Sequence, residues 1–423
     1  MIENFKEYVN NSFTAYHAVD NAEKILKENG FVRLYEKDLW DISVGGKYYS
    51  VRGGTALIAF TVGGTSGFKI AASHTDSPAL KIKQNPLIKE NGYVKLNVEK
   101  YGGSILYSFL DRPLRIAGRI VYEDCGKLVS ENVVSDYFLI IPSLAIHMNR
   151  GVNDGFTVNP QTDLCPVFDL ADGDAPTELY KTLTDKAVVD SDLYLVNADK
   201  CTDIGVSGKL ISAPRVDNLT SVFSSLNALT NAPVTGDIAI TALFNSEEIG
   251  NGTAEGAASD MLDSAIIRIC SSLGISDAQR YAMIARSVLL SVDVAHAVHP
   301  NHPEKADPTN RPKLGGGVVL KYNAGGNYVT DARSAALVKA VSDKAGVPYQ
   351  TFHSRSDMPC GSTLGKSFVC RCGMLACDIG LPQLAMHSAY ETFAKEDLYS
   401  LYGCIKEFFA SDIEISDNAI SFK

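Results

Sequence analysis

The chain has 423 residues, of which 45% are hydrophobic, and its 49 acidic and 39 basic residues give a formal net charge of −10. Such a chain can bury a large core, and its length predicts two domains or one large domain with an insertion. No segment clusters lysine and arginine with aromatic residues, so the composition argues against a nucleic-acid partner and against binding to an anionic membrane surface.

Targeting signals and paired cysteines are missing from the sequence. The start, Met1–Val9, lacks the basic residues and the continuous apolar core of a signal peptide, and no run approaches about 18 apolar residues. The nine cysteines are scattered from Cys125 to Cys404 without CxxC pairs, which favours reduced thiols. We therefore expect a cytoplasmic protein, and we assign no chemical role to Cys360.

The sequence of the first half of the chain predicts a helix, then a buried strand, and then a long β-rich stretch. Residues 3–29 carry helical spacing and end at a glycine, which is a common stop signal. Residues 67–74 are an apolar run that predicts a short buried strand, followed by a turn. From residue 90 to 212, β-branched runs and short turns predominate, which indicates a β-rich insertion.

Helices and strands alternate after residue 213. We predict helices at 217–230, 254–273, 331–345 and 393–410, and strands at 237–244, 287–293 and 316–322. The fold class is therefore α/β, with a mixed sheet flanked by helices. Residues 1–89 and 213–423 form this catalytic domain, and residues 90–212 form the inserted β-rich domain.

Metal-ligand-type residues stand where predicted strands and helices begin or end. They are His74, Asp217, Glu248, Asp293 and His387. In open α/β sheets, ligands bind beyond the carboxyl ends of the strands, so one composite site would bring these residues together. Two histidines and three carboxylates suit two Zn²⁺ ions that share one aspartate, and Mn²⁺ or Co²⁺ would also suit this set.

Each of these residues also has a simpler explanation, because a lone His or Asp after a strand is usually only a cap or a turn residue. Asp217 opens a helical pattern and is explained by capping, Glu247 and Glu248 by a solvated turn, and His387 by a buried histidine in the core. If all of these simpler explanations were true, the complete ligand set would have arisen by coincidence. Glu247 beside a ligand is free to move a proton, so the pattern favours a catalytic centre over a structural one.

Several longer strings accompany these residues. They are Tyr16–Val19, His74–Pro78, Ile141–His147, Asp217–Asn218, Glu247–Gly250, Asp293–Asn301, Asp357–Thr363 and Pro382–Ser388. Together they resemble the aspartyl aminopeptidase family of dinuclear zinc exopeptidases, and the resemblance covers nearly the whole chain. It implies a zinc exopeptidase-like catalytic domain.

The resemblance implies a role for each site residue by its position. One zinc would be held by His74, Asp217 and Asp293, and the other by Asp217, Glu248 and His387. Glu247 would be the general base. Asp76 would orient the His74 ring, which also agrees with the usual pairing of a ligating imidazole with a carboxylate.

Three further residues are candidates for contacts with the substrate. His296 is a candidate donor to the developing oxyanion. By resemblance, Lys321 would contact an acidic side chain of the substrate, and His147 would reach the active site of a neighbouring subunit. The resemblance also implies dimers that assemble into a tetrahedral dodecamer.

The sequence thus predicts a metal-dependent aminopeptidase that removes N-terminal Asp or Glu from peptides. A related co-catalytic zinc aminopeptidase with neutral or broad specificity is one alternative. The other is a non-catalytic shell or cargo protein, which would have no need of Glu247.

Overall fold

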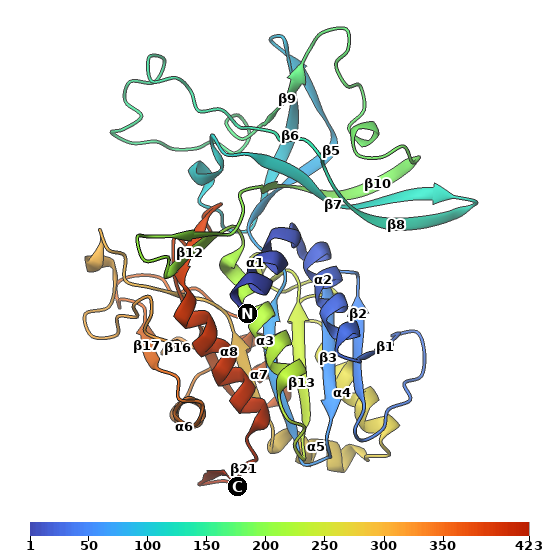
Figure 1. Ribbon diagram of the computed structural model, residues 1–423, viewed down its shortest axis with the longest axis vertical. Coiled ribbons are helices and arrows are strands. Elements are labelled where there is room, and N and C mark those ends of the chain that lie inside the picture. Colours follow the sequence, from blue (N-terminus) through green and yellow to red (C-terminus); the bar gives the residue numbers. More distant parts are fainter. Residues whose placement is uncertain (423) are drawn as a thin grey trace.

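A nine-stranded mixed sheet with helices on both faces forms the body of the computed structural model, which describes residues 1–422 (Figure 1). This architecture confirms the predicted α/β class. The strand order is β1-β2-β3-β13-β4-β14-β18-β16-β17. The strands are β1 (Val32–Leu34), β2 (Lys47–Arg52), β3 (Ala56–Val62), β4 (Phe68–His74), β13 (Ile238–Phe244), β14 (Val288–Val292), β16 (Val318–Tyr322), β17 (Tyr349–His353) and β18 (Leu375–Gly380).

Four neighbouring central strands run parallel. They are β13, β4, β14 and β18, and Phe244 at the end of β13 lies opposite His74 at the end of β4. Every residue of β13, β4 and β14 is buried, because helices cover both faces of the sheet and leave no polar side. The carboxyl ends of these strands therefore meet at one edge of the sheet.

Helices cover the two faces of the sheet in two groups. One face packs against α1 (Ile2–Asn11), α2 (Ala15–Glu28), α3 (Val216–Asn231), α6 (Ala332–Ala345) and α8 (Lys395–Ala410). The other packs against α4 (Met261–Ser272), α5 (Asp277–Ala285) and α7 (Gly365–Cys372). Along β4, Ala71 joins the first core while Ile70 and Ala72 join the second, as the alternation of a strand requires.

A six-stranded antiparallel sheet lies beyond this edge (Figure 1). Its order is β8-β7-β10-β5-β6-β9. Its strands are β5 (Ala79–Glu90), β6 (Tyr93–Tyr101), β7 (Leu114–Asp124), β8 (Lys127–Val134), β9 (Val167–Leu170) and β10 (Val188–Asn197). We propose a division of the chain into two units along these sheets, with the inserted unit of residues 90–212 extended back to include β5.

A third sheet of five strands joins the two units. Its order is β11-β12-β20-β19-β15, with β11 (Thr202–Ile204), β12 (Leu210–Ala213), β15 (Ala295–His296), β19 (Pro382–Leu384) and β20 (Glu391–Ala394). A small hairpin, β21 (Ile413–Ile415) with β22 (Ile420–Phe422), follows α8. Within residues 1–422, no helix combines the length and apolar character needed to cross a bilayer.

The predicted elements differ from the observed ones mainly at helices. The single helix predicted at 3–29 is two helices, because α1 ends at Asn11 and α2 begins at Ala15. Ser12 is buried and accepts a hydrogen bond from the Asn21 side chain, which holds the break in place. The helix predicted at 254–273 begins only at Met261. Helices α5 and α7 were not predicted.

Lys69 near the start of β4 is a buried cation whose loss should destabilise the fold. Its Nζ lies 3.0 Å from the Asp237 carboxylate and also donates to the carbonyl oxygens of Phe409 and Ser411. The Lys69→Met variant leaves a buried carboxylate without its partner, and we expect it to lower the free energy of unfolding by about 3–5 kcal/mol. Urea unfolding followed by circular dichroism measures this loss. Lys24→Met, at an exposed position of α2, is the control, and equal stability of the two variants would contradict the prediction.

Candidate metal centre

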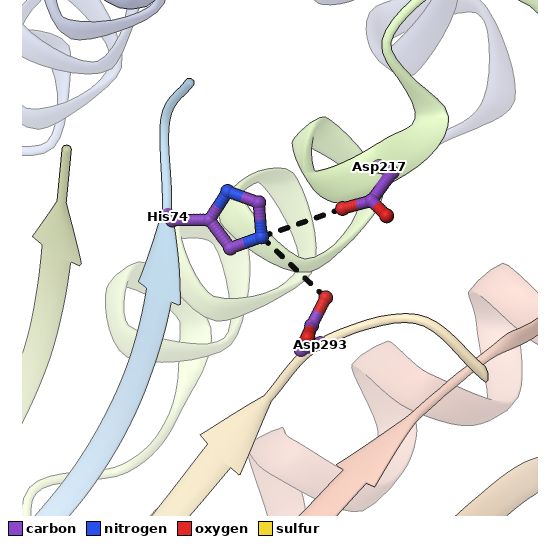
Figure 2. Close-up of side chains that lie close together, drawn as sticks. All are labelled: His74, Asp217 and Asp293. Carbon is purple, nitrogen blue, oxygen red and sulfur yellow. Dashed lines mark ion pairs between the residues drawn. The ribbon is translucent and has the colours of Figure 1, made fainter. Parts of the chain in front are cut away.

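The first group of candidate ligands lies at the shared edge of the central strands. His74 ends β4, Asp293 follows β14, and Asp217 stands in the first turn of α3 (Figure 2). The His74 Nε2 atom lies 3.3 Å from Asp217 Oδ1 and 3.5 Å from Asp293 Oδ1. Three elements that are far apart in the sequence therefore direct their ligand atoms at one point.

The second group shares Asp217 with the first. The His387 Nε2 atom lies 3.4 Å from Asp217 Oδ2 and 3.5 Å from Glu248 Oε1. In each group the ligand atoms lie within 4.8 Å of one another. Asp217 thus directs one carboxylate oxygen to each group, which is the geometry of a bridging ligand.

The spacing and the hydrogen bonding of these atoms fit bound cations. Zinc holds nitrogen and oxygen ligands at about 2.0–2.2 Å in a tetrahedron, which separates ligand atoms by about 3.3 Å. Three carboxylate oxygens of the two groups, Asp217 Oδ1, Glu248 Oε1 and Asp293 Oδ1, are buried without a hydrogen-bond partner. Such oxygens are costly unless a cation compensates them.

The pKa values of the candidate ligands also show that the buried carboxylates favour a positive charge nearby. Burial alone would lower the pKa of His387, but the carboxylates of Asp217 and Glu248 outweigh it and raise the pKa to about 10. Burial raises the pKa of Glu248, and the nearby Asp217 carboxylate raises it further. The pKa of Asp217 is lowered, because its ion pairs with the His387 and His74 rings outweigh the burial that would raise it. Without metal ions, protons on imidazoles offset the charge of the carboxylates.

Two buried carboxylates that are not ligands hold the main chain on either side of the centre. Asp76 accepts the backbone N–H groups of Glu247 and Glu248, each at 3.2 Å, and the Tyr101 hydroxyl at 2.8 Å. The His74 Nδ1 atom lies 3.1 Å from the Asp76 carbonyl oxygen and 3.4 Å from its Oδ1. Asp76 therefore contacts one ligand ring and positions the turn that carries the candidate base.

Glu391 in β20 is the counterpart of Asp76, and our sequence analysis missed it. It accepts the backbone N–H of Asp217 at 3.0 Å and that of His387 at 2.8 Å. The side chain is 2% exposed, so these two bonds are formed away from water. A carboxylate within an apolar strand, four residues after a candidate ligand, is the sequence signal that points to it.

Left-handed backbone conformations cluster around the ligands. Residues Arg215, Ser246, Ala385 and His387 have φ between 58° and 66°, although none is glycine. Each such residue costs on the order of 1–3 kcal/mol, and the surrounding contacts must hold it in place. These turns direct the candidate ligands, which lie just after strands or at the start of a helix, towards the metal centre.

The inserted unit also contributes to the centre. The carbonyl oxygen of Gly103, just after β6, lies 3.2 Å from His387 Nδ1, so it fixes the ring whose other nitrogen faces Asp217. A Cβ on Gly102, with φ +73°, would lie 3.1 Å from the Glu248 Cβ. The main chain at Gly102 and Gly103 thus passes close to His387 and Glu248. A larger residue at Gly102 would disturb these ligands.

The candidate base stands beside the ligand Glu248 in the sequence, and the candidate oxyanion donor stands three residues after Asp293. Glu247 is half-buried in the turn after β13, and within residues 1–422 its carboxylate forms no hydrogen bond. Burial raises the pKa of this carboxylate to about 8, and the neighbouring carboxylates of Asp293 and Asp217 add to the effect. His296 in β15 is exposed and packs on the Phe352 ring at 5.8 Å.

The two candidate substrate contacts lie in different environments. Lys321 at the end of β16 is 1% exposed, and its Nζ donates to the Val294 carbonyl at 3.0 Å and lies 3.5 Å from Asp293 Oδ2. His147 is exposed in the long loop between β8 and β9, and it belongs to neither ligand group. Within a single subunit, Lys321 therefore lies next to the metal ligand Asp293, whereas His147 lies on the surface.

We expect loss of the Glu391 carboxylate to weaken metal binding. Glutamine cannot accept from both backbone N–H groups, because one oxygen becomes an amide donor. The Glu391→Gln variant should bind zinc about 10–100-fold more weakly, as found when groups that orient ligands are lost. Competition with a chromophoric chelator measures this affinity, with the exposed Glu396→Gln as the control. An affinity equal to that of the control would refute the role of Glu391.

Comparison with known proteins agrees with this site. A family described as "Aminopeptidase I zinc metalloprotease (M18)" matches residues 8–409. The "Probable M18 family aminopeptidase 2" of Clostridium acetobutylicum is 40% identical over 419 residues, which cover 95% of this chain and 97% of that one. The protein of the same name from Pseudomonas aeruginosa is 37% identical, with coverage of 96% and 97%.

Solved structures show the same fold. The chain in "Cryo-EM structure of the Ape4 and Nbr1 complex" matches with a TM-score of 0.91 and 34% identity, covering 96% of this chain and 85% of that one. "Crystal structure of prApe1" matches with a TM-score of 0.89 and 28% identity, covering 96% and 93%. The fold and the site define a zinc metallo-aminopeptidase. The chain belongs to the M18 family, which is the aspartyl aminopeptidase family.

Proposed function

We propose that this M18 aminopeptidase removes N-terminal Asp and Glu residues from peptides at a centre of two zinc ions per subunit. The observation that supports this most strongly is the pair of ligand groups that share Asp217. Asp293 completes one group with His74, and Glu248 completes the other with His387. Mn²⁺ or Co²⁺ would suit the same donors.

The residues around the centre would divide the reaction between them. Paired zinc ions, when bound, would lower the pKa of a water molecule towards about 7 and polarise the scissile carbonyl. The Glu247 carboxylate would accept a proton from this water and then deliver it to the leaving amine. In the metal-free centre, burial raises the pKa of Glu247, so this carboxylate is able to hold a proton. Asp76 would orient His74 and fix the turn of Glu247.

His296 and Lys321 would act on the substrate. The His296 ring would donate to the developing oxyanion. Lys321 places a positive charge 3.5 Å from Asp293, and an acidic side chain bound beside that ligand would be attracted by it. This charge is the basis for our proposal of selectivity for an acidic first residue.

We propose that the enzyme works as an assembly in the cytoplasm. One matching structure is titled as a dodecamer of mApe1 from S. cerevesiae, with a TM-score of 0.83 and 26% identity. By analogy, this chain would form dimers and a tetrahedral dodecamer. His147 would then reach the active site of a neighbouring subunit from its exposed loop.

Kinetics on first-residue substrates test the proposed specificity. Asp-, Glu- and Leu-terminal anilides are compared on one preparation whose metal content is measured. We expect kcat/KM for Asp and Glu to exceed that for Leu by at least about tenfold, which corresponds to about 1.4 kcal/mol. A preference for Leu would contradict acidic specificity while leaving the aminopeptidase class intact.

A further inference from the structure

A groove beside the metal centre is lined by basic groups. Its empty volume is about 930 Å³, part of it open to solvent. The titratable side chains that line it are His296, His299, His302, Lys305, His353 and Arg355. We refer to it as the basic groove.

The charge of this lining differs from that of the chain as a whole. No aspartate or glutamate lines the groove, although the chain has a net charge of −10. Four of the eight histidines in the sequence lie there. Neutral imidazoles donate hydrogen bonds and protonated ones add charge, so such a lining favours an anion in either state.

The two cationic side chains of the groove, Lys305 and Arg355, differ in how freely they can bind a ligand. Lys305 is exposed, and within residues 1–422 it has no ion pair. Arg355 forms hydrogen bonds of 2.9 Å and 2.6 Å with Asp357, which directs its guanidinium and partly offsets its charge. Glu304 lies 3.4 Å from His302 Nδ1 but does not line the groove. Lys305 is therefore the main free cation of the groove.

The groove borders residues that support the metal centre. His296 in β15 lies opposite Gln383 in β19, and both line the groove. Gln383 donates to Glu391, which holds the main chain of His387. From His296 the groove extends to the loop around Lys305, in residues 299–312. A peptide held at the metals by its first residue would find its path to solvent along this groove.

We propose that the basic groove binds the part of the peptide that follows the scissile bond and favours an acidic side chain there. This inference rests on the proposed aminopeptidase function. It is separate from the selectivity for the first residue, because Lys321 is buried against Asp293 and does not line the groove. The substrate class is therefore peptides with an acidic group at the second or third residue.

Matched peptides test this proposal. We compare Asp-Ala-Ala-Ala-amide with Asp-Glu-Ala-Ala-amide and Asp-Ala-Glu-Ala-amide, and we replace the first Asp by whichever residue the enzyme cleaves best. We expect at least one glutamate peptide to have a KM about fivefold lower, as one charged contact of about 1 kcal/mol gives. The advantage should shrink at high salt, because ions screen exposed charges. Dissociation constants of the same peptides for the Glu247→Gln variant give a readout that does not require turnover.

The variant Lys305→Gln should remove the advantage of the acidic peptide, and Lys24→Gln on α2 should keep it. Equal KM and equal dissociation constants for all three peptides would overturn the proposal. A change in first-residue preference in Lys305→Gln, with no change downstream, would also overturn it. Failure of the acidic first-residue preference alone would affect only the proposed function, since the downstream comparison uses the best-cleaved first residue.

Discussion

The Glu247→Gln variant is expected to hydrolyse peptides about 10²–10⁴-fold more slowly while it keeps its zinc. The reduction follows from the loss of general-base catalysis, because an amide cannot accept the proton of water and return it to the leaving amine. Zinc content should not change, since Glu247 belongs to neither ligand group. Single-turnover kinetics and elemental analysis of the same preparation measure both quantities.

Two controls make this result specific. Glu255→Gln alters a nearby carboxylate outside both ligand groups and should retain activity. The Glu247→Asp variant keeps a base but withdraws it by one methylene, so we expect an intermediate rate. An undiminished rate in Glu247→Gln would refute the assignment of the base.

The Asp217→Asn variant is expected to lose both metal ions and, with them, essentially all activity. Asp217 directs one oxygen to each ligand group, and an amide offers only one neutral oxygen. In the metal-free protein the His387 and His74 rings stabilise the Asp217 carboxylate, because they outweigh its burial and lower its pKa. We therefore expect metal-free Asp217→Asn to be less stable at neutral pH than the metal-free parent protein, as thermal unfolding in the presence of a chelator would show.

Asp293→Asn is the matched comparison for the bridging role. Asp293 belongs to the group of His74 alone, so its amide variant should lose the ion of that group and retain the other. Elemental analysis after dialysis should find about one zinc per chain in this variant and less than one in Asp217→Asn. Equal zinc contents in the two variants would argue against a shared ligand.

The central sheet was predictable because its strands are marked by composition. The predicted strands at 237–244 and 287–293 correspond to β13 (Ile238–Phe244) and β14 (Val288–Val292), since buried parallel strands read as continuous apolar runs. The helix α5 was missed, although Ser276 and Gln279 form a capping box at its start. Met283 is its one buried residue, so it has no apolar stripe facing the core and hydrophobic spacing gave little signal.

The ligand residues could be proposed from the sequence because each stands at the end of an apolar run or the start of a helix. The groups that hold these ligands in position could not be proposed from the sequence. Glu391 acts through the main chain of Asp217 and His387, and the Gly103 carbonyl reaches His387 from the inserted unit. Such contacts depend on how distant segments pack together, which local patterns do not record.

Anomalous diffraction at the zinc edge on zinc-loaded crystals tests the central claim most directly. We predict two peaks a few ångströms apart, one between His74 and Asp293 and the other between His387 and Glu248, with Asp217 between them. A single peak, or peaks that do not share Asp217, would contradict the account.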